Sequence, residues 1–184
     1  KQFYGGLGQN FINPALIGRA FLVAAYPTQT TGAAFATGRM VTDASTYATP
    51  LAQLKAGTAI VNADAIKNAL IGNVGGTIGE TCAIALIIGG IYLLVKHVIS
   101  WRIPVVYIVV VFILTSLMRG NGFLGGVYEI FCGGLMLGAI FMATDYVTSP
   151  ISAKGQIIFA IGCGVLTSLI RVYGGYPEGV SYSI

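Results

Sequence analysis

Long apolar runs separated by few charges restrict this chain to a membrane-embedded helical fold. Charged residues make up 9% of the chain and hydrophobic residues 55%, whereas a soluble domain carries roughly 25% charged residues. We therefore expect an all-α integral membrane protein with a single transmembrane domain over residues 1–184. The expected transmembrane runs cover about residues 11–26, 82–98, 103–118, 129–144 and 157–171.

Several of these runs are shorter than the ~20 residues that a helix needs to cross a bilayer. Pro14 and Pro104 fall near the starts of two runs, and the chain contains 26 glycines. Small residues let transmembrane helices approach closely, and the G-x-x-x-G spacing of Gly134 and Gly138 predicts such a contact. Short, interrupted segments are typical of tilted or broken helices that line a site near the membrane midplane.

The basic residues predict which side of the membrane each loop faces. The connection of residues 96–102 is the most basic short loop and contains Trp101, so the positive-inside rule places it in the cytoplasm. Counting spans back from it puts the polar segment of residues 28–79 outside the cytoplasm. The basic residues of the chain form no aromatic-interleaved patch, so membrane lipid, and not nucleic acid, is the expected surrounding.

One polar stretch within residues 28–79 carries the clearest chemical signal. It runs from Asp43 to Pro50 and matches the pattern D-x-x-[ST]-x-A-T. In that pattern the final threonine, here Thr49, carries flavin mononucleotide (FMN) through a phosphoester bond. Thr46 and Ala48 match the remaining fixed positions.

The same residues have a second interpretation. Pro50 favours the start of a helix, which places Thr49 at the N-cap. Backbone N–H groups at a helix N-terminus attract phosphate, so this position suits a phosphoester. A threonine before proline is equally an ordinary N-cap in a polar loop, and the local sequence leaves both interpretations open.

Six further motifs occur in order along almost the whole chain. They read FYGGLGQN at 3–10, FINPA at 11–15, GET at 79–81, WRIP at 101–104, FMATD at 141–145 and RVYGGYPEG at 171–179. With these motifs the chain resembles the D subunit of the Rnf electron-transport complex. It is less closely similar to the B subunit of the sodium-translocating NADH:quinone reductase.

This resemblance implies a fold and a cofactor. The fold implied is a urea-transporter-like bundle of tilted and broken helices, and we expect further segments beyond both ends of the chain. The cofactor implied is covalent FMN on Thr49, attached outside the cytoplasm by a flavin transferase that reads Asp43, Thr46 and Ala48. Tyr47 departs from the family, because many members have glycine there. The presence of a second, non-covalent flavin stays open.

The resemblance also implies a role. The Rnf complex oxidises reduced ferredoxin, reduces NAD and couples this reaction to Na⁺ or H⁺ movement. The chain is then a non-autonomous electron-transfer subunit in the cytoplasmic (inner) membrane, with the other Rnf subunits as partners and no metal site or complete catalytic site of its own. The alternatives are the B subunit of a Na⁺-translocating quinone reductase and a passive small-solute channel of the same fold.

Acidic residues and cysteines allow further interpretations. Ionisable groups at membrane depth are functional by default, which makes Glu129 and Asp145 candidates for an ion path. Acidic residues are also favourable near helix N-termini, and we favour helix capping for Glu129. Cys82, Cys132 and Cys163 lack the spacing of metal sites and are expected to be small buried residues.

Overall fold

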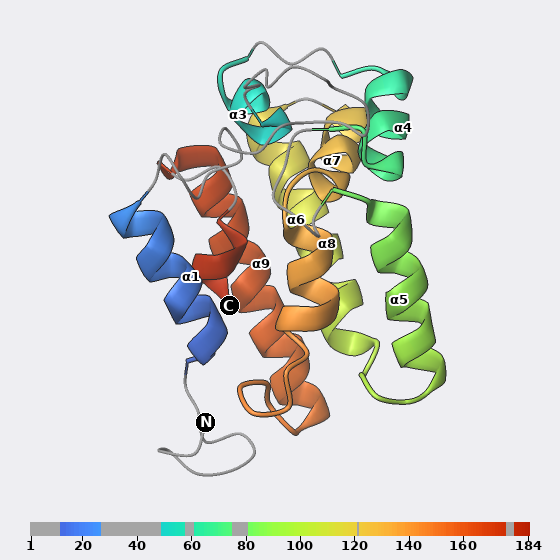
Figure 1. Ribbon diagram of the computed structural model, residues 1–184, viewed down its shortest axis with the longest axis vertical. Helices are drawn as coiled ribbons and strands as arrows, with labels where there is room; N and C mark the ends of the chain where they lie inside the picture. The colour runs from blue at the N-terminus through green and yellow to red at the C-terminus, as the bar shows by residue number, and fades with distance from the viewer. Residues whose placement is uncertain (1–11, 27–48, 58–60, 75–80, 121, 176–178) are drawn as a thin grey trace.

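The computed structural model describes residues 12–26, 49–57, 61–74, 81–120, 122–175 and 179–184 (Figure 1). Across these ranges the chain is all-helical and contains no strand, which confirms the all-α class. The elements are α1 (Pro14–Ala25), α3 (Pro50–Lys55), α4 (Ala63–Ile71), α5 (Ala83–Val95), α6 (Arg102–Arg119), α7 (Gly122–Phe131), α8 (Leu135–Leu137), the π-helix η2 (Gly138–Met142), α9 (Ala153–Tyr173) and α10 (Val180–Ser183).

Helices α6 and α9 are the two helices in the described part of the chain that are long and apolar enough to cross a membrane. Their 18 and 21 residues correspond to about 27 and 32 Å at 1.5 Å per residue, close to the ~30 Å hydrocarbon core. They pack against each other and form the centre of the bundle. Tyr107 and Val111 of α6 lie in one buried cluster with Ala160 and Cys163 of α9.

A third candidate span is broken. Helix α7 and the segment Leu135–Met142 together pass the same test, but they are bent by 67° relative to each other. The sequence predicted one run from residue 129 to 144, whereas the helix starts at Gly122 and stops at Phe131. Gly133 explains the break, because its φ of +71° is left-handed and interrupts the helical hydrogen-bond ladder. Helices α1 and α5 are shorter apolar helices beside these spans.

Close helix contacts occur where the sequence supplies glycine. A Cβ placed on Gly138 would lie 2.3 Å from Val180 of α10, and one on Gly90 would lie 2.9 Å from Ile140 of η2. The close contact expected of the G-x-x-x-G motif is therefore confirmed at Gly138. These approaches hold the broken span between α5 and α10.

The two short helices α3 and α4 lie at one end of the bundle, beside α7 (Figure 1). Leu51 and Leu54 of α3 pack into a second buried cluster with Ala69 of α4 and with Tyr128 and Cys132 around the end of α7. The loop between α5 and α6 lies at the opposite end of the molecule (Figure 1). The urea-transporter-like arrangement of the helices stays a prediction.

Candidate functional site

Thr49 is the N-cap of α3. Its Oγ1 accepts a hydrogen bond from the backbone N–H of Ala52 at 3.4 Å, and Pro50 occupies the first turn of the helix. The N-cap expected from the sequence is therefore confirmed. The residue is half-buried, so its hydroxyl is held in a defined place at the end of the bundle while remaining in reach of the surface.

Helix α3 is anchored on both sides. The side chains of Leu51 and Leu54 are buried against α4 and α7. On the other side, Lys55 Nζ donates a hydrogen bond to the carbonyl of Gly174, just after the end of α9. A helix of this length is unstable by itself, so these contacts are what fix the position of Thr49.

The other three residues of the flavin-attachment pattern, Asp43, Thr46 and Ala48, lie outside the described residues. Thr49 is the one member of the predicted set whose surroundings the structure describes. The predictions for the other three stay predictions from the sequence pattern.

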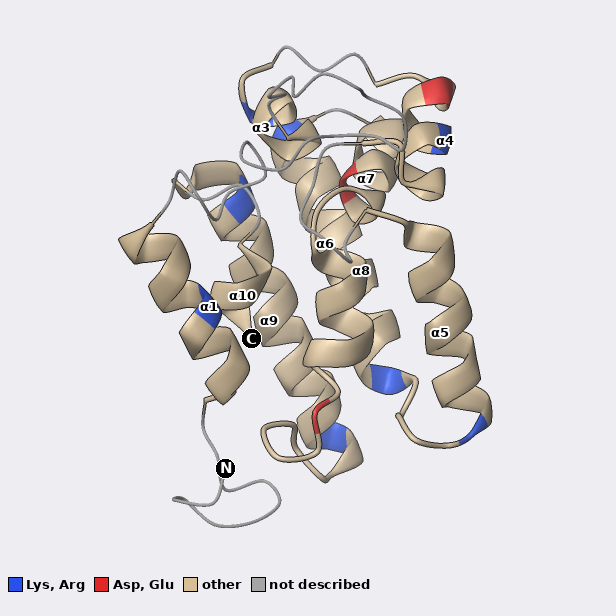
Figure 2. Ribbon diagram, viewed as in Figure 1, with Lys and Arg blue, Asp and Glu red and all other residues tan. Residues whose placement is uncertain are grey.

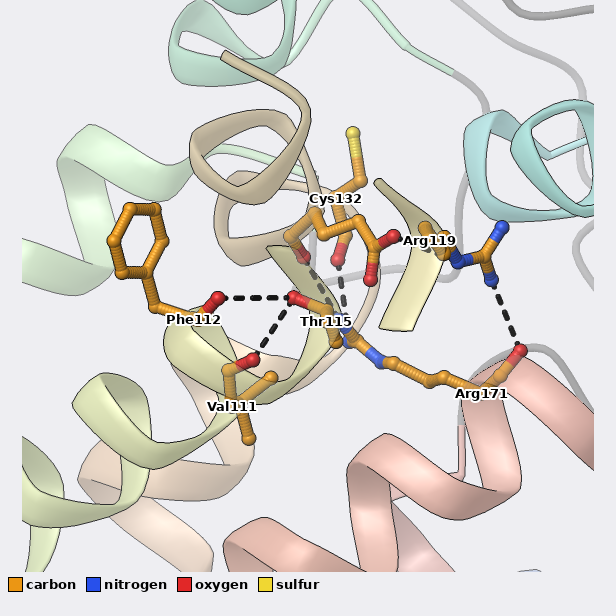
Figure 3. Close-up of polar contacts among 7 residues, drawn as sticks. Val111, Phe112, Thr115, Arg119, Cys132 and Arg171 are labelled. Carbon is orange, nitrogen blue, oxygen red and sulfur yellow. Dashed lines mark hydrogen bonds and ion pairs between the residues drawn. The ribbon is translucent and has the colours of Figure 1, made fainter. Parts of the chain in front are cut away.

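A buried polar cluster lies beneath α3, where α6, α7 and α9 meet (Figure 3). We call Arg119, Glu129 and Arg171 the arginine cluster. Arg119 Nε lies 2.9 Å from Glu129 Oε1, and Arg119 Nη2 donates to the carbonyl of Arg171 at 3.0 Å. Arg171 is 0% exposed and Glu129 is 1% exposed. The ion pair and the hydrogen bond thus link one residue from each of three helices.

Arg171 also completes the broken helix. Its Nη1 donates to the carbonyl of Glu129 at 2.8 Å, and its Nη2 donates to the carbonyl of Cys132 at 3.4 Å (Figure 3). The last carbonyls of a helix have no partner within the helix, and at membrane depth no water replaces the missing partner. The guanidinium therefore stabilises the end of α7 both through hydrogen bonds and through its charge at the negative end of the helix dipole.

Gly133 connects this cluster to α3. A Cβ on Gly133 would lie 2.5 Å from Leu51 Cδ1 and 3.6 Å from Arg171 Nη2. The side chains of Leu51 and Arg171 therefore both lie against Gly133, at the break in the span. Because Leu51 is two residues from Thr49, the broken helix directly supports the segment that begins at Thr49.

The structure corrects the interpretation of Glu129. The sequence favoured helix capping at the start of a run, which was wrong, because Glu129 lies in the last turn of α7 and is paired with Arg119. Arg119 and Arg171 were not identified as site residues, since each falls at the end of an apolar run and resembles an interface anchor. The available signal was a carboxylate and two arginines in apolar helices that carry at most one other charged residue each.

The cysteines do not form a metal site with other described residues. No group of three or more His, Cys, Asp or Glu side chains in the described ranges is placed to hold a metal ion. Cys132 and Cys163 are buried, whereas Cys82 is partly exposed. The expectation of small buried residues is therefore confirmed for Cys132 and Cys163, and Cys82 departs from it because it lies just before the first residue of α5.

A second polar group lies inside the bundle between α6, α9 and α10. The hydroxyl of Tyr107 lies 2.6 Å from Thr167 Oγ1 and 2.9 Å from Ser183 Oγ, and the latter two are 2.6 Å apart. Ser183 donates on to the carbonyl of Val180 at 2.9 Å. All three side chains are buried, and their mutual bonds satisfy hydroxyl groups that would otherwise be unpaired in an apolar interior.

Comparison with known proteins identifies the family. The profile of the NQR2, RnfD, RnfE family matches residues 1–184. The chain is 52% identical over 185 residues to the D subunit of the Na⁺-translocating ferredoxin:NAD⁺ oxidoreductase complex of Acetobacterium woodii, covering 100% of this chain and 56% of that protein. It is 49% identical over 194 residues to the D subunit of the proton-translocating ferredoxin:NAD⁺ oxidoreductase complex of Clostridium ljungdahlii, covering 100% of this chain and 58% of that protein.

A more distant relative belongs to the quinone reductases. The B subunit of the Na⁺-translocating NADH-quinone reductase of Chromohalobacter salexigens is 36% identical over 195 residues, covering 100% of this chain and 46% of that protein. The chain thus spans between about half and three-fifths of the length of these relatives. With a match over its whole length, the chain belongs to the NQR2, RnfD, RnfE family.

Proposed function

We propose that this chain is part of the D subunit, the membrane electron-transfer subunit, of an ion-translocating ferredoxin:NAD oxidoreductase complex, with FMN esterified to Thr49. The observation that carries the proposal is the placement of Thr49 at the fixed N-cap of α3, within a sequence that matches the flavin-attachment pattern. Support for the complex comes from the two D-subunit relatives, which are more similar to this chain than the quinone reductase relative is.

The residues around Thr49 fit a phosphate ester. The Thr49 hydroxyl is half-buried, and its oxygen accepts one long hydrogen bond of 3.4 Å. The ester would lie at the start of α3, where backbone N–H groups favour the negative charge of a phosphate. FMN, when bound, accepts one or two electrons and so links one-electron centres to a two-electron acceptor.

The protein's own contribution is positional. Leu51 and Leu54 hold α3 on the broken span, and Lys55 holds it on α9. These contacts give Thr49 a fixed distance from the bundle, and electron transfer between centres depends on fixed distances. The ester oxygen would be Thr49 Oγ1, the atom that now accepts from Ala52.

The other subunits of such a complex are proposed as partners, on the basis of the two D-subunit relatives. A flavin transferase that acts during maturation is proposed from the flavin-attachment pattern. The two D-subunit relatives are named for Na⁺ and for protons respectively, so similarity does not select the coupling ion. Thr49, at the start of α3, is proposed to lie outside the cytoplasm, because α3 lies at the end of the bundle opposite the basic loop between α5 and α6 (Figure 1).

Covalent flavin on a denaturing gel tests the proposal. The full-length protein, Thr49→Val and the matched control Thr42→Val are each expressed with an active flavin transferase. Ultraviolet fluorescence is expected in the unmodified protein and in Thr42→Val, and its loss is expected in Thr49→Val. Fluorescence that persists in Thr49→Val would show that the flavin is attached to a different residue. Its absence from all three, with the transferase active on another substrate, would reject covalent FMN and leave the passive channel as the leading alternative.

A further inference from the structure

A cavity lies at the end of the bundle opposite α3, between the loop of residues 96–102 and the loop that follows η2. Its volume is about 410 Å³, within the roughly 300–1,000 Å³ range of small-ligand sites. Arg102 and Gln156 line it, together with the hydroxyl-bearing side chains of Thr144 and Ser149. The cavity therefore offers one permanent cation and several hydrogen-bonding groups.

The walls of this cavity are tied together by specific contacts. Ser100 Oγ donates to Gln156 Oε1 at 3.0 Å, which joins the first loop to α9. The second loop is closed by the backbone N–H of Ser149, which donates to the carbonyl of Asp145 at 2.9 Å. Two separate segments of the chain are thus held around one space.

Charge at this end of the molecule is mainly positive. Lys96 at the end of α5 and Lys154 in the first turn of α9 join Arg102 there, and Asp145 is the acidic residue among the described ones at this end (Figure 2). The sum is +2 (3 − 1). Lys96 and Lys154 are exposed, whereas Arg102 is half-buried in the cavity wall. An anionic ligand is attracted to the opening and then meets Arg102.

The edge of the cavity is apolar and uncovered. Trp101 is 60% exposed, Tyr146 is 56% exposed and Ile151 is 78% exposed, and all three line the cavity. Tryptophan and tyrosine are enriched where a membrane protein crosses the boundary between hydrocarbon and headgroups. Arg102 begins the membrane-length helix α6, so the cavity lies at the level of the headgroups.

We propose that this cavity binds the phosphate headgroup of an anionic glycerophospholipid, with Arg102 as its main partner and the acyl chains lying along Trp101 and Ile151. Basic pockets between transmembrane helices are suited to such headgroups. A cationic interior beside an exposed apolar edge matches the two-part chemistry of a lipid. A soluble phosphate would use only the interior, and an acidic protein segment would leave the apolar edge uncovered. The proposal is independent of the flavin on Thr49.

Native mass spectrometry of the full-length protein in mild detergent tests this site. Dioleoyl phosphatidylglycerol and dioleoyl phosphatidylcholine are each titrated into the protein. Glycerol phosphate is added as a soluble competitor. One molecule of phosphatidylglycerol is expected to bind more tightly than phosphatidylcholine. Arg102→Gln is expected to weaken it about fivefold, Arg102→Lys to restore most of the binding, and the exposed Lys67→Gln at the other end of the bundle to leave it unchanged. Glycerol phosphate is expected not to displace the lipid.

Ile151→Asp provides a second test that leaves Arg102 in place. It puts a negative charge on the exposed apolar edge and is expected to weaken phosphatidylglycerol binding as well. Equal binding of phosphatidylglycerol by Arg102→Gln and the unmodified protein would overturn the proposal, as would full displacement by glycerol phosphate. A photo-crosslinker at residue 151 of the assembled complex is expected to label lipid. Labelling of a partner protein in its place would also overturn the proposal.

Discussion

The two ends of the bundle use their polar residues in opposite ways. At the α3 end, Glu129 and Arg171 are buried, Arg119 forms an ion pair with Glu129, and Arg171 bonds the end of α7. At the other end, Arg102 and its polar neighbours line a cavity whose edge is exposed. Both ends carry arginine, but Arg171 at the α3 end is fully buried, whereas Arg102 at the loop end is half-buried.

This difference in burial indicates a structural role for the polar residues at the α3 end and a binding role for those at the loop end. An ion pair between two helices fixes their relative positions, because removing one partner leaves the other charge in an apolar region without it. Charges that line an open space cost little to leave unpaired and are free to bind a ligand. The α3 end is therefore suited to holding Thr49 in place, and the loop end is suited to exchanging contacts with the membrane.

The largest expected effect comes from breaking the ion pair at the α3 end. Arg119→Leu leaves Glu129 buried without its partner, and the free energy of unfolding in detergent should fall by about 3–5 kcal/mol. The double variant Arg119→Leu/Glu129→Leu should recover most of this loss, since it removes both charges together. Denaturant titration of the purified protein measures both. A double variant no more stable than the single one would show that the pair is not what holds this end.

The next effect concerns the break in the span. Gly133→Ala puts a side chain at a left-handed φ and against Leu51, whereas Gly120→Ala has a similar φ of +64° and no atom within 4 Å. Both changes carry the backbone cost of roughly 1–2 kcal/mol, and Gly133→Ala should lose a further ~1–3 kcal/mol through overpacking. The yield of flavin on Thr49 should fall only in Gly133→Ala. Equal losses of stability in the two variants would show that the packing of Leu51 against Gly133 does not stabilise the protein.

The smallest expected effect lies at the loop end. Ser100→Ala removes the hydrogen bond to Gln156, and stability should fall by about 0.5–1.5 kcal/mol. The affinity for phosphatidylglycerol should also fall, because the first loop that forms the cavity is no longer joined to α9. Thermal unfolding and lipid titration on the same preparation separate the two quantities. If Ser100→Ala lowered the free energy of unfolding as much as Arg119→Leu, the two ends would not differ in their structural roles.

Some of this architecture could be predicted from the sequence because it depends on local signals. Pro50 marked the start of α3 and placed Thr49 at its N-cap, and Pro104 marked the first turn of α6. The close approach at Gly138 followed from residue size alone. Helix ends and small-residue contacts are set by a few neighbouring residues, so one sequence is enough to identify them.

The arginine cluster could not be predicted because its contacts span the chain. Arg171 lies 42 residues from the carbonyl of Glu129 that it caps, and 52 residues from Arg119. No spacing rule connects such positions before the helices are packed. The bend of 67° at Gly133 has the same origin, because its angle depends on how Leu51 and Arg171 fill the space around the glycine.

The mass of the peptide that contains Thr49 shows most directly whether FMN is attached to this residue. The full-length protein is co-expressed with a flavin transferase and digested, and its peptides are sequenced by tandem mass spectrometry. We expect a mass increase equal to one FMN less one water, located on Thr49 and absent from the other hydroxyl residues of that peptide. An unmodified Thr49, or FMN on a different residue, would contradict this expectation.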